Sequence, residues 1–91
     1  MNKSELVDAI AAKASTTKKD ADAILSATLE AIIEAVSGGD KVTLVGFGTF
    51  ETRDRAARPG HNPATGEAIS IPAKKVPAFS AGKVFKERVL S

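Results

Sequence analysis

The residues of this 91-residue chain best placed for chemistry lie in one polar stretch, residues 53–67 (RDRAARPGHNPATGE). Its Arg53, Arg55 and Arg58 offer fixed positive charges that suit phosphate groups. The stretch contains no large apolar side chain, so it cannot bury itself against a core. This combination predicts an exposed segment that binds an anionic partner. The alternative is a solvated strand edge whose charges prevent aggregation.

A turn divides the stretch. Asn62-Pro63-Ala64-Thr65 has Asn in the first and Pro in the second position of a β-turn. The sequence therefore predicts a two-stranded ribbon with Pro63 at its tip, and an isolated ribbon is only marginally stable in water. Ten residues of strand reach roughly 33 Å, enough to follow a groove of DNA. Pro63 is either an ordinary turn residue or an apolar wedge without a backbone donor.

An enzyme is not expected from these residues. The chain has one histidine, His61, and no cysteine, so neither a catalytic dyad nor a histidine–cysteine metal site can be assembled. Gly46-Phe47-Gly48 is too short for a nucleotide-binding loop and is more typical of a turn. We therefore expect no catalytic residue, no metal, no cofactor and no small-molecule substrate.

Charge is distributed unevenly along the chain, although the net charge is only +2. Residues 1–40 hold four lysines and seven acidic residues, whereas residues 41–91 hold nine Lys or Arg and four acidic residues. The two balances are −3 and +5, which sum to +2. This asymmetry favours a basic working surface on an acidic body.

The segments that must position these residues follow from periodicity. Asn2 and Glu5 resemble a capping box at the start of a first helix, and Thr17 with Asp20 marks a second helix from about residue 18 to 37. Gly38-Gly39 ends it. From Lys41 the period changes to two, with strands around Val42, Phe50 and Ile69–Ile71. We expect Ser80 to be the N-cap of a last helix.

The second helix carries more apolar surface than one small chain can cover. Its apolar residues span an arc of roughly 180°, whereas a surface helix needs little more than about 100°. They are Ala21, Ile24, Leu25, Leu29, Ile32, Ile33, Ala35 and Val36. Because a chain this short also lacks disulfides, we expect a homodimer. A signal peptide and a membrane-spanning segment are not expected, so the predicted location is intracellular.

Several runs together resemble the HU and integration host factor family. They are residues 45–50 (VGFGTF), the arginines with Gly60, Asn62-Pro63 and Thr65-Gly66 of the ribbon, residues 76–83 (VPAFSAGK) and residues 1–6 (MNKSEL). The likeness covers essentially the whole chain without gaps. The chain is less cationic at the tip than is usual for the family, with His61 where arginine is common and with Ala64 and Glu67.

The resemblance implies an α+β fold: an N-terminal helical hairpin, a three-stranded antiparallel sheet with a long protruding β-ribbon arm, and a short C-terminal helix, in an intertwined dimer. It implies a single domain, 1–91, in which residues 1–40 form the dimerisation base and residues 41–79 the sheet, with the arm at about 53–75. Residues 80–91 form the last helix.

The resemblance also implies a function, since HU and integration host factor are standard examples of architectural proteins that bend DNA from the minor groove. The partner is double-stranded DNA, with a preference for nicked, kinked or flexible DNA, and the location is the nucleoid. Pro63 would intercalate. The DNA-binding set would be Lys3, Gly46, Arg53, Arg55, Arg58, His61, Asn62, Pro63, Lys75, Lys83 and Lys86.

Two alternatives stay open at this point. One is a subunit of a site-specific, heterodimeric DNA bender of the integration host factor kind. The other is a helical protein-interaction module whose ribbon binds acidic partners. The ribbon lacks an array of side chains for reading the major groove, where the base code is unique. Non-specific readout of DNA shape and deformability is therefore favoured.

Overall fold

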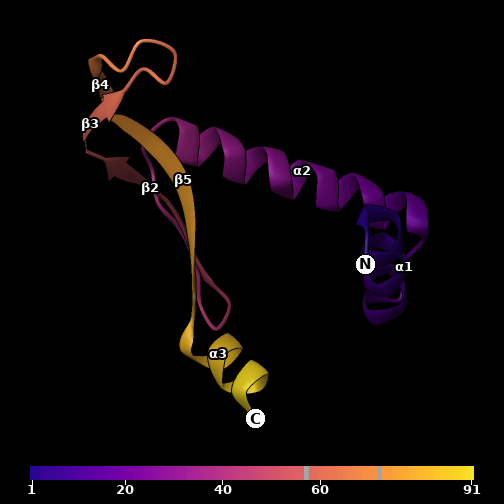
Figure 1. Cartoon of the computed structure of the whole chain (residues 1–91). Coiled ribbons are helices and arrows are strands. Elements are labelled where there is room, and N and C mark those ends of the chain that lie inside the picture. The colour runs from indigo at the N-terminus through magenta and orange to yellow at the C-terminus, as the bar shows by residue number, and fades with distance from the viewer. Residues whose placement is uncertain (57, 72) are drawn as a thin grey trace. The chain divides into compact units, whose positions relative to one another are not determined.

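The computed structural model describes residues 1–56, 58–71 and 73–91, and for residues 58, 59 and 69–71 it describes the backbone alone. The order of elements is two helices, five strands and a last helix in this part of the chain (Figure 1). Two compact units, Met1–Glu34 and Ala35–Ser91, make up the chain. Each is described by itself.

Helix α1 (Lys3–Ala14) begins as its sequence indicates. The Asn2 side chain accepts a hydrogen bond from the Glu5 amide at 2.9 Å, and the Glu5 carboxylate accepts one from the Asn2 amide at 3.4 Å. This reciprocal capping box satisfies two amides that have no partner within the helix. The helix ends at Ser15, whose φ of 54° lies in the left-handed region.

Helix α2 (Lys18–Ser37) begins where the Thr17 hydroxyl accepts a hydrogen bond from the Asp20 amide at 3.1 Å. At its other end, Gly39 has a φ of +89° and donates to the Val36 carbonyl, while Asp40 donates to the Ala35 carbonyl. This is a Schellman motif, and its positive φ favours glycine. Both predicted ends of α2 are confirmed.

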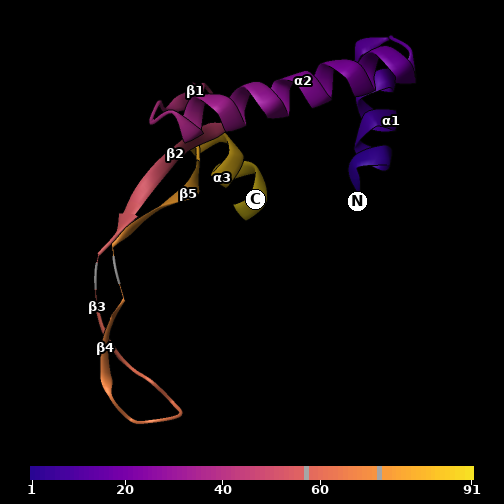
Figure 2. The same cartoon turned by 90° about the horizontal axis from the view of Figure 1, so that it is seen from above.

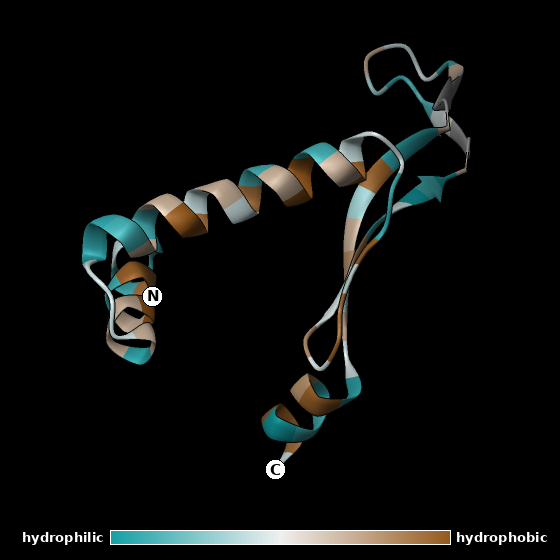
Figure 3. Ribbon diagram, turned by 180° about the vertical axis from the view of Figure 1, so that it is seen from behind, coloured by the Kyte–Doolittle hydropathy of each residue, from teal (hydrophilic) through white to brown (hydrophobic). Residues whose placement is uncertain are grey.

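A small core joins α1 to the first turns of α2. Val7, Ala11 and Ala21 are buried together, with Ile10 and Leu25 packed against them. Several other large apolar side chains of this unit are open to solvent. Ile24 is 63% and Ile33 64% exposed, and apolar residues recur along α2 in Figure 3. The predicted excess of apolar surface on α2 is therefore present in the single chain.

The second unit is built on an antiparallel sheet of three strands, in the order β1 (Val42–Leu44), β2 (Gly48–Arg55) and β5 (Lys74–Ala81). β1 and β2 are joined by a tight turn in which the Phe47 amide donates to the Leu44 carbonyl at 2.9 Å. Gly46 has a φ of +82° there, as the third residue of a type II turn requires. Gly48, expected in the turn, is instead the first residue of β2.

The four phenylalanines of the chain form one cluster in this unit. Ring centroids are 4.7 Å apart for Phe50 and Phe79, and 5.4 Å for Phe47 with either Phe79 or Phe85. Phe85 belongs to helix α3 (Lys83–Leu90), so the cluster fixes α3 to the sheet. Phe47 and Phe79 keep 45% and 40% of their surface exposed, and the cluster is therefore incompletely covered within one chain.

The start of α3 corrects one prediction. Ser80 is not the N-cap, because β5 continues to Ala81 in register with β2, where Ser80 lies opposite Thr49 and Ala81 opposite Gly48. The N-cap is Gly82, which makes no side-chain capping bond. Its amide donates instead to the Phe47 carbonyl at 2.8 Å. Strand pairing has thus prevailed over a favourable local capping signal.

Candidate nucleic-acid interface

Strand register gives the three-stranded sheet two different faces, because successive residues of a strand point to opposite sides. Phe50 lies opposite Phe79, and these two rings mark the aromatic face. The other face we call the basic face. It carries the cross-strand pairs Thr49–Ser80, Glu51–Ala78, Arg53–Val76 and Arg55–Lys74. The predicted arginines 53 and 55 therefore share one face.

Arg53 is held in place on the basic face. Its Nη2 donates a hydrogen bond to the Ser80 hydroxyl at 2.8 Å, and its Nε lies 3.8 Å from Glu51 Oε1. The second carboxylate oxygen of Glu51 lies 3.3 Å from the Lys41 ammonium. Glu51 is 24% exposed, whereas Arg53 is 59% exposed. The network thus orders two cations around one half-buried carboxylate and leaves the guanidinium open to solvent.

At the end of β2 and β5 that is next to the arm, cations lie opposite each other instead of sharing a carboxylate. Arg55 and Lys74 lie directly opposite each other on the basic face, and both are exposed. Asp54 and Lys75 lie directly opposite each other on the other face. The predicted residue Lys75 therefore does not share a face with Arg53 and Arg55, whereas its neighbour Lys74 does.

The arm is a second antiparallel sheet, formed by β3 (Arg58–His61) and β4 (Ala68–Ile71). Figure 2 shows the pair as a ribbon closed by a loop. Arg58 lies at the first paired position of β3, opposite Ile71, and its side chain lies outside the described residues. His61 is exposed opposite Ala68. Pro72, which a paired strand accommodates only at an edge or a bulge, lies outside the described residues.

The loop of residues 62–67 is shaped by Asn62. The Asn62 amide donates to the Glu67 carbonyl, and its own carbonyl accepts from the Gly66 amide, both at 2.7 Å. The Asn62 side chain accepts from the Ala64 amide at 2.9 Å, which is an Asx-turn. Asn62 thus closes the loop through three hydrogen bonds, and Pro63, next to it, is exposed. The position predicted for Pro63, in the loop at the end of the ribbon, is confirmed.

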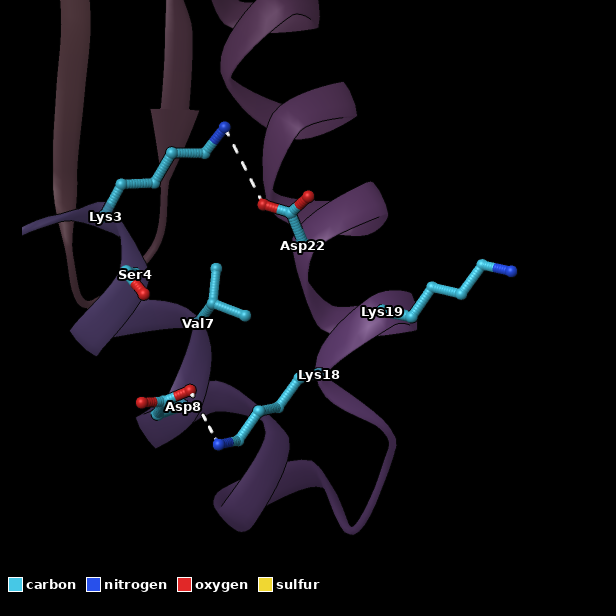
Figure 4. Close-up of a pocket in the computed structure, with 7 residues that line it drawn as sticks. All are labelled: Lys3, Ser4, Val7, Asp8, Lys18, Lys19 and Asp22. Carbon is cyan, nitrogen blue, oxygen red and sulfur yellow. Dashed lines mark ion pairs between the residues drawn. The ribbon is translucent and has the colours of Figure 1, made fainter.

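Lys3 lies in the first unit, in a hollow between α1 and α2 (Figure 4). Its ammonium donates to the Ser26 hydroxyl at 2.8 Å and lies 3.8 Å from Asp22. A second ion pair, between Lys18 and Asp8 at 3.3 Å, links the two helices nearby. Lys3 is therefore exposed but internally paired, so a phosphate would compete with Asp22 for it.

The remaining predicted residues lie in the second unit. Gly46 is exposed at the β1–β2 turn, where nothing lies near the position of a side chain. Lys83 and Lys86 are exposed on α3, and Lys83 is 3.9 Å from Glu87. Two cations of the basic face, Lys41 and Lys74, were absent from the predicted set. Arg53 and Arg55 are two residues apart in β2 and so share a face. Only the register of β2 with β5 shows that Lys74 lies on that face too.

The described side chains of this region offer positive charge to an anionic partner. Exposed guanidinium and ammonium groups attract phosphates, and binding of a nucleic acid to them releases counterions. Among residues 1–56, 58–71 and 73–91, no cluster of His, Cys, Asp or Glu could hold a metal ion. In the same residues, no helix has the length and apolarity needed to cross a membrane.

Comparison with known proteins agrees with this description. Residues 1–90 match the family described as bacterial DNA-binding protein. The DNA-binding protein HU of Nostoc sp. is 71% identical over 89 residues, covering 98% of this chain and 95% of the relative. That of Geobacillus stearothermophilus is 54% identical, covering 98% and 99%. The chain therefore belongs to the bacterial DNA-binding protein family, among relatives that carry the name HU.

Solved structures show the same fold. A cocrystal structure of Anabaena HU with DNA matches with a TM-score of 0.90 and 71% identity, covering 98% of this chain and 97% of that one. HU from Thermotoga maritima matches with a TM-score of 0.69 and 39% identity, covering 98% of each chain. The predicted fold of an N-terminal helical hairpin, a three-stranded antiparallel sheet with a β-ribbon, and a C-terminal helix is confirmed.

Proposed function

We propose that this protein is a non-sequence-specific architectural DNA-binding protein that bends and compacts chromosomal DNA. The observation that carries the proposal is the β3–β4 ribbon with Pro63 exposed in its end loop, in a chain 71% identical to an HU that was crystallised with DNA. The ribbon follows the minor groove, and Pro63 wedges between base pairs and unstacks them, as in other minor-groove architectural proteins. Its location is the nucleoid.

The proposed roles divide the predicted residues into two groups. The first group belongs to the arm and its base. Its arginines, Arg53, Arg55 and Arg58, neutralise phosphates or enter the groove. The other members are His61 and Asn62 near the tip and Lys75 on the returning strand. Lys3, Lys83 and Lys86 bind phosphates on the body, and Gly46 permits close approach of the backbone. These contacts position the protein without reading the sequence.

We also propose that the protein is a homodimer. The exposed apolar side chains of α2 and the half-covered phenylalanine cluster both require an apolar cover, and a second copy of the chain supplies it. Residues 1–40 then form the dimerisation base, residues 41–81 the sheet and arm, and residues 83–90 the last helix of a single domain. Ile33→Glu tests the homodimer, because it places a charge on the surface of α2 that the second copy is proposed to cover. We expect sedimentation equilibrium to give a dimer for the wild type and loss of the dimer for the variant.

The test of DNA binding is a fluorescence anisotropy titration of labelled duplexes, intact and nicked, at two salt concentrations. The label belongs on the DNA because the protein has neither Trp nor Tyr. Binding should weaken steeply with salt, since phosphate contacts release counterions. It should also favour the nicked duplex, which bends at lower cost. Absence of binding at low salt would overturn the proposal, and saturable binding to a folded protein in excess DNA would favour the interaction module.

A further inference from the structure

The pair of Arg55 and Lys74 is an unusual arrangement in the sheet. These two residues are directly opposite in the register of β2 and β5, and both side chains are exposed. Side chains at such positions have Cβ atoms about 4.5–5.5 Å apart. Like charges at that separation repel each other and destabilise the pairing of the strands. The arrangement therefore favours binding of an anion between the two cations.

Within the residues that the structure describes, this repulsion is not relieved by the protein itself. Arg53 and Lys41 share the Glu51 carboxylate, but no ion pair joins Arg55 or Lys74 to an acidic side chain among the pairs found there. The adjacent pair in the register, Asp54 opposite Lys75, combines opposite charges. Lys74 therefore has a positively charged residue opposite it in the sheet, whereas Lys75 has a negatively charged one.

The two faces of the sheet also differ in what they can contact. The aromatic face carries Phe50 and Phe79, and its exposed ring surface requires an apolar cover. A highly charged phosphate backbone cannot supply that cover. The basic face carries Lys41, Arg53, Arg55 and Lys74 against the single carboxylate of Glu51. Phosphate is therefore expected on the basic face.

We infer that Arg55 and Lys74 together form a phosphate-binding site at the base of the arm, and that the basic face of β2 and β5 is turned toward DNA. This inference rests on the proposed function. It adds Lys74 to the DNA-binding residues and gives it a larger share of phosphate binding than Lys75. Arg53 lies on the same face, two residues before Arg55 in β2 and further from the arm.

Lys74→Ala and Lys75→Ala form a matched pair for the test, since each removes one positive charge from neighbouring positions of one strand. Binding of each variant to a labelled duplex is measured by anisotropy over a range of salt concentrations, alongside the wild type. One phosphate contact changes the slope of log K against log salt by about 0.9. We expect Lys74→Ala to make the slope shallower by about that amount per chain, and Lys75→Ala to change it clearly less. Thermal melts by circular dichroism check that both variants are folded.

Every other pattern of slopes would overturn the inference. A larger loss for Lys75→Ala would turn the opposite face toward DNA. Equal losses would mean that only the general positive field matters, and no loss for either would remove this region from the interface. Failure of the wild type to bind DNA would instead refute the proposed function, so the two failures are distinguishable.

A second measurement reports the face without relying on affinity. The chain has no cysteine, so Lys74→Cys and Lys75→Cys each introduce a single site for an iron chelate that cleaves nearby DNA. We expect the chelate at position 74 to cleave the bound duplex more strongly than the chelate at position 75. Stronger cleavage from position 75 would overturn the inference.

Discussion

The Arg53 guanidinium donates a hydrogen bond through Nη2 to the Ser80 hydroxyl at 2.8 Å, across the β2–β5 pairing. The bond links a residue at the base of the arm to the last part of β5, shortly before α3 begins. The same guanidinium lies 3.8 Å from Glu51. Arg53 is therefore ordered before any DNA binds, which lowers the entropy lost when its charge meets a phosphate.

Ser80→Ala tests this ordering. The variant removes the hydroxyl acceptor but leaves Glu51 in place, so Arg53 must be ordered when DNA binds; we expect affinity to fall by about two- to fivefold, the entropic cost of about 0.5–1 kcal/mol for immobilising one side chain. The free energy of unfolding should change by less than about 0.5 kcal/mol, as for most surface substitutions. Ser4→Ala, on α1, serves as the matched control. Unchanged affinity for Ser80→Ala in the anisotropy titration would show that the bond does not prepare Arg53 for DNA.

Gly48→Ala tests the packing that joins β2 to the phenylalanine cluster. A Cβ atom at Gly48 would lie 2.5 Å from the Phe79 ring and 2.5 Å from the Ser80 carbonyl oxygen. Because one of these neighbours is backbone, we expect a loss of about 1–3 kcal/mol in the free energy of unfolding. Urea denaturation measures it, with Thr49→Ala in the same strand as the control. A midpoint equal to that of the wild type would contradict the packing described.

Pro63→Ala tests the wedge. The side chain is exposed in the loop that Asn62 closes, so the variant should fold normally. We expect it to bend DNA less at saturation, with a smaller effect on affinity, because unstacking requires the rigid apolar ring. Pro77→Ala, in β5, controls for the loss of a proline outside the loop. Equal bending by Pro63→Ala and the wild type would refute the wedge.

Arg58→Ala tests the start of the arm. Arg58 opens β3, and a phosphate contact there carries no sequence information. We expect weaker binding to every duplex and a salt slope shallower by about 0.9 per chain. Arg88→Ala, in the last turn of α3, provides a control with the same loss of charge. A salt slope for Arg58→Ala that matches the wild type would mean that Arg58 does not contact phosphate.

Elements defined by local signals could be predicted from the sequence. The capping box of Asn2 and Glu5 and the glycine cap of α2 depend on residues within one turn of each other, and both lie where expected. Ser80 was wrongly assigned because its role depends on pairing with Thr49, 31 residues away. Long-range pairing of this kind outweighs local propensity and cannot be read from neighbouring residues.

The same contrast between local signals and long-range pairing applies to the candidate site. The ribbon and Pro63 at its end follow from the absence of apolar residues and from the turn sequence. Lys74 and Lys75 could not be separated from the sequence, because a shift of one residue in register exchanges the two faces of a strand. Only the observed pairing of Arg55 with Lys74 distinguishes them.

DNA bending by this protein is tested most directly by the end-to-end distance of a short duplex labelled with a donor and an acceptor at its two ends. Energy transfer is measured as the protein is added to saturation, with anisotropy reporting occupancy in the same samples. We expect transfer to rise in step with occupancy, because binding through the arm bends the duplex. Full occupancy with no change in transfer would contradict it.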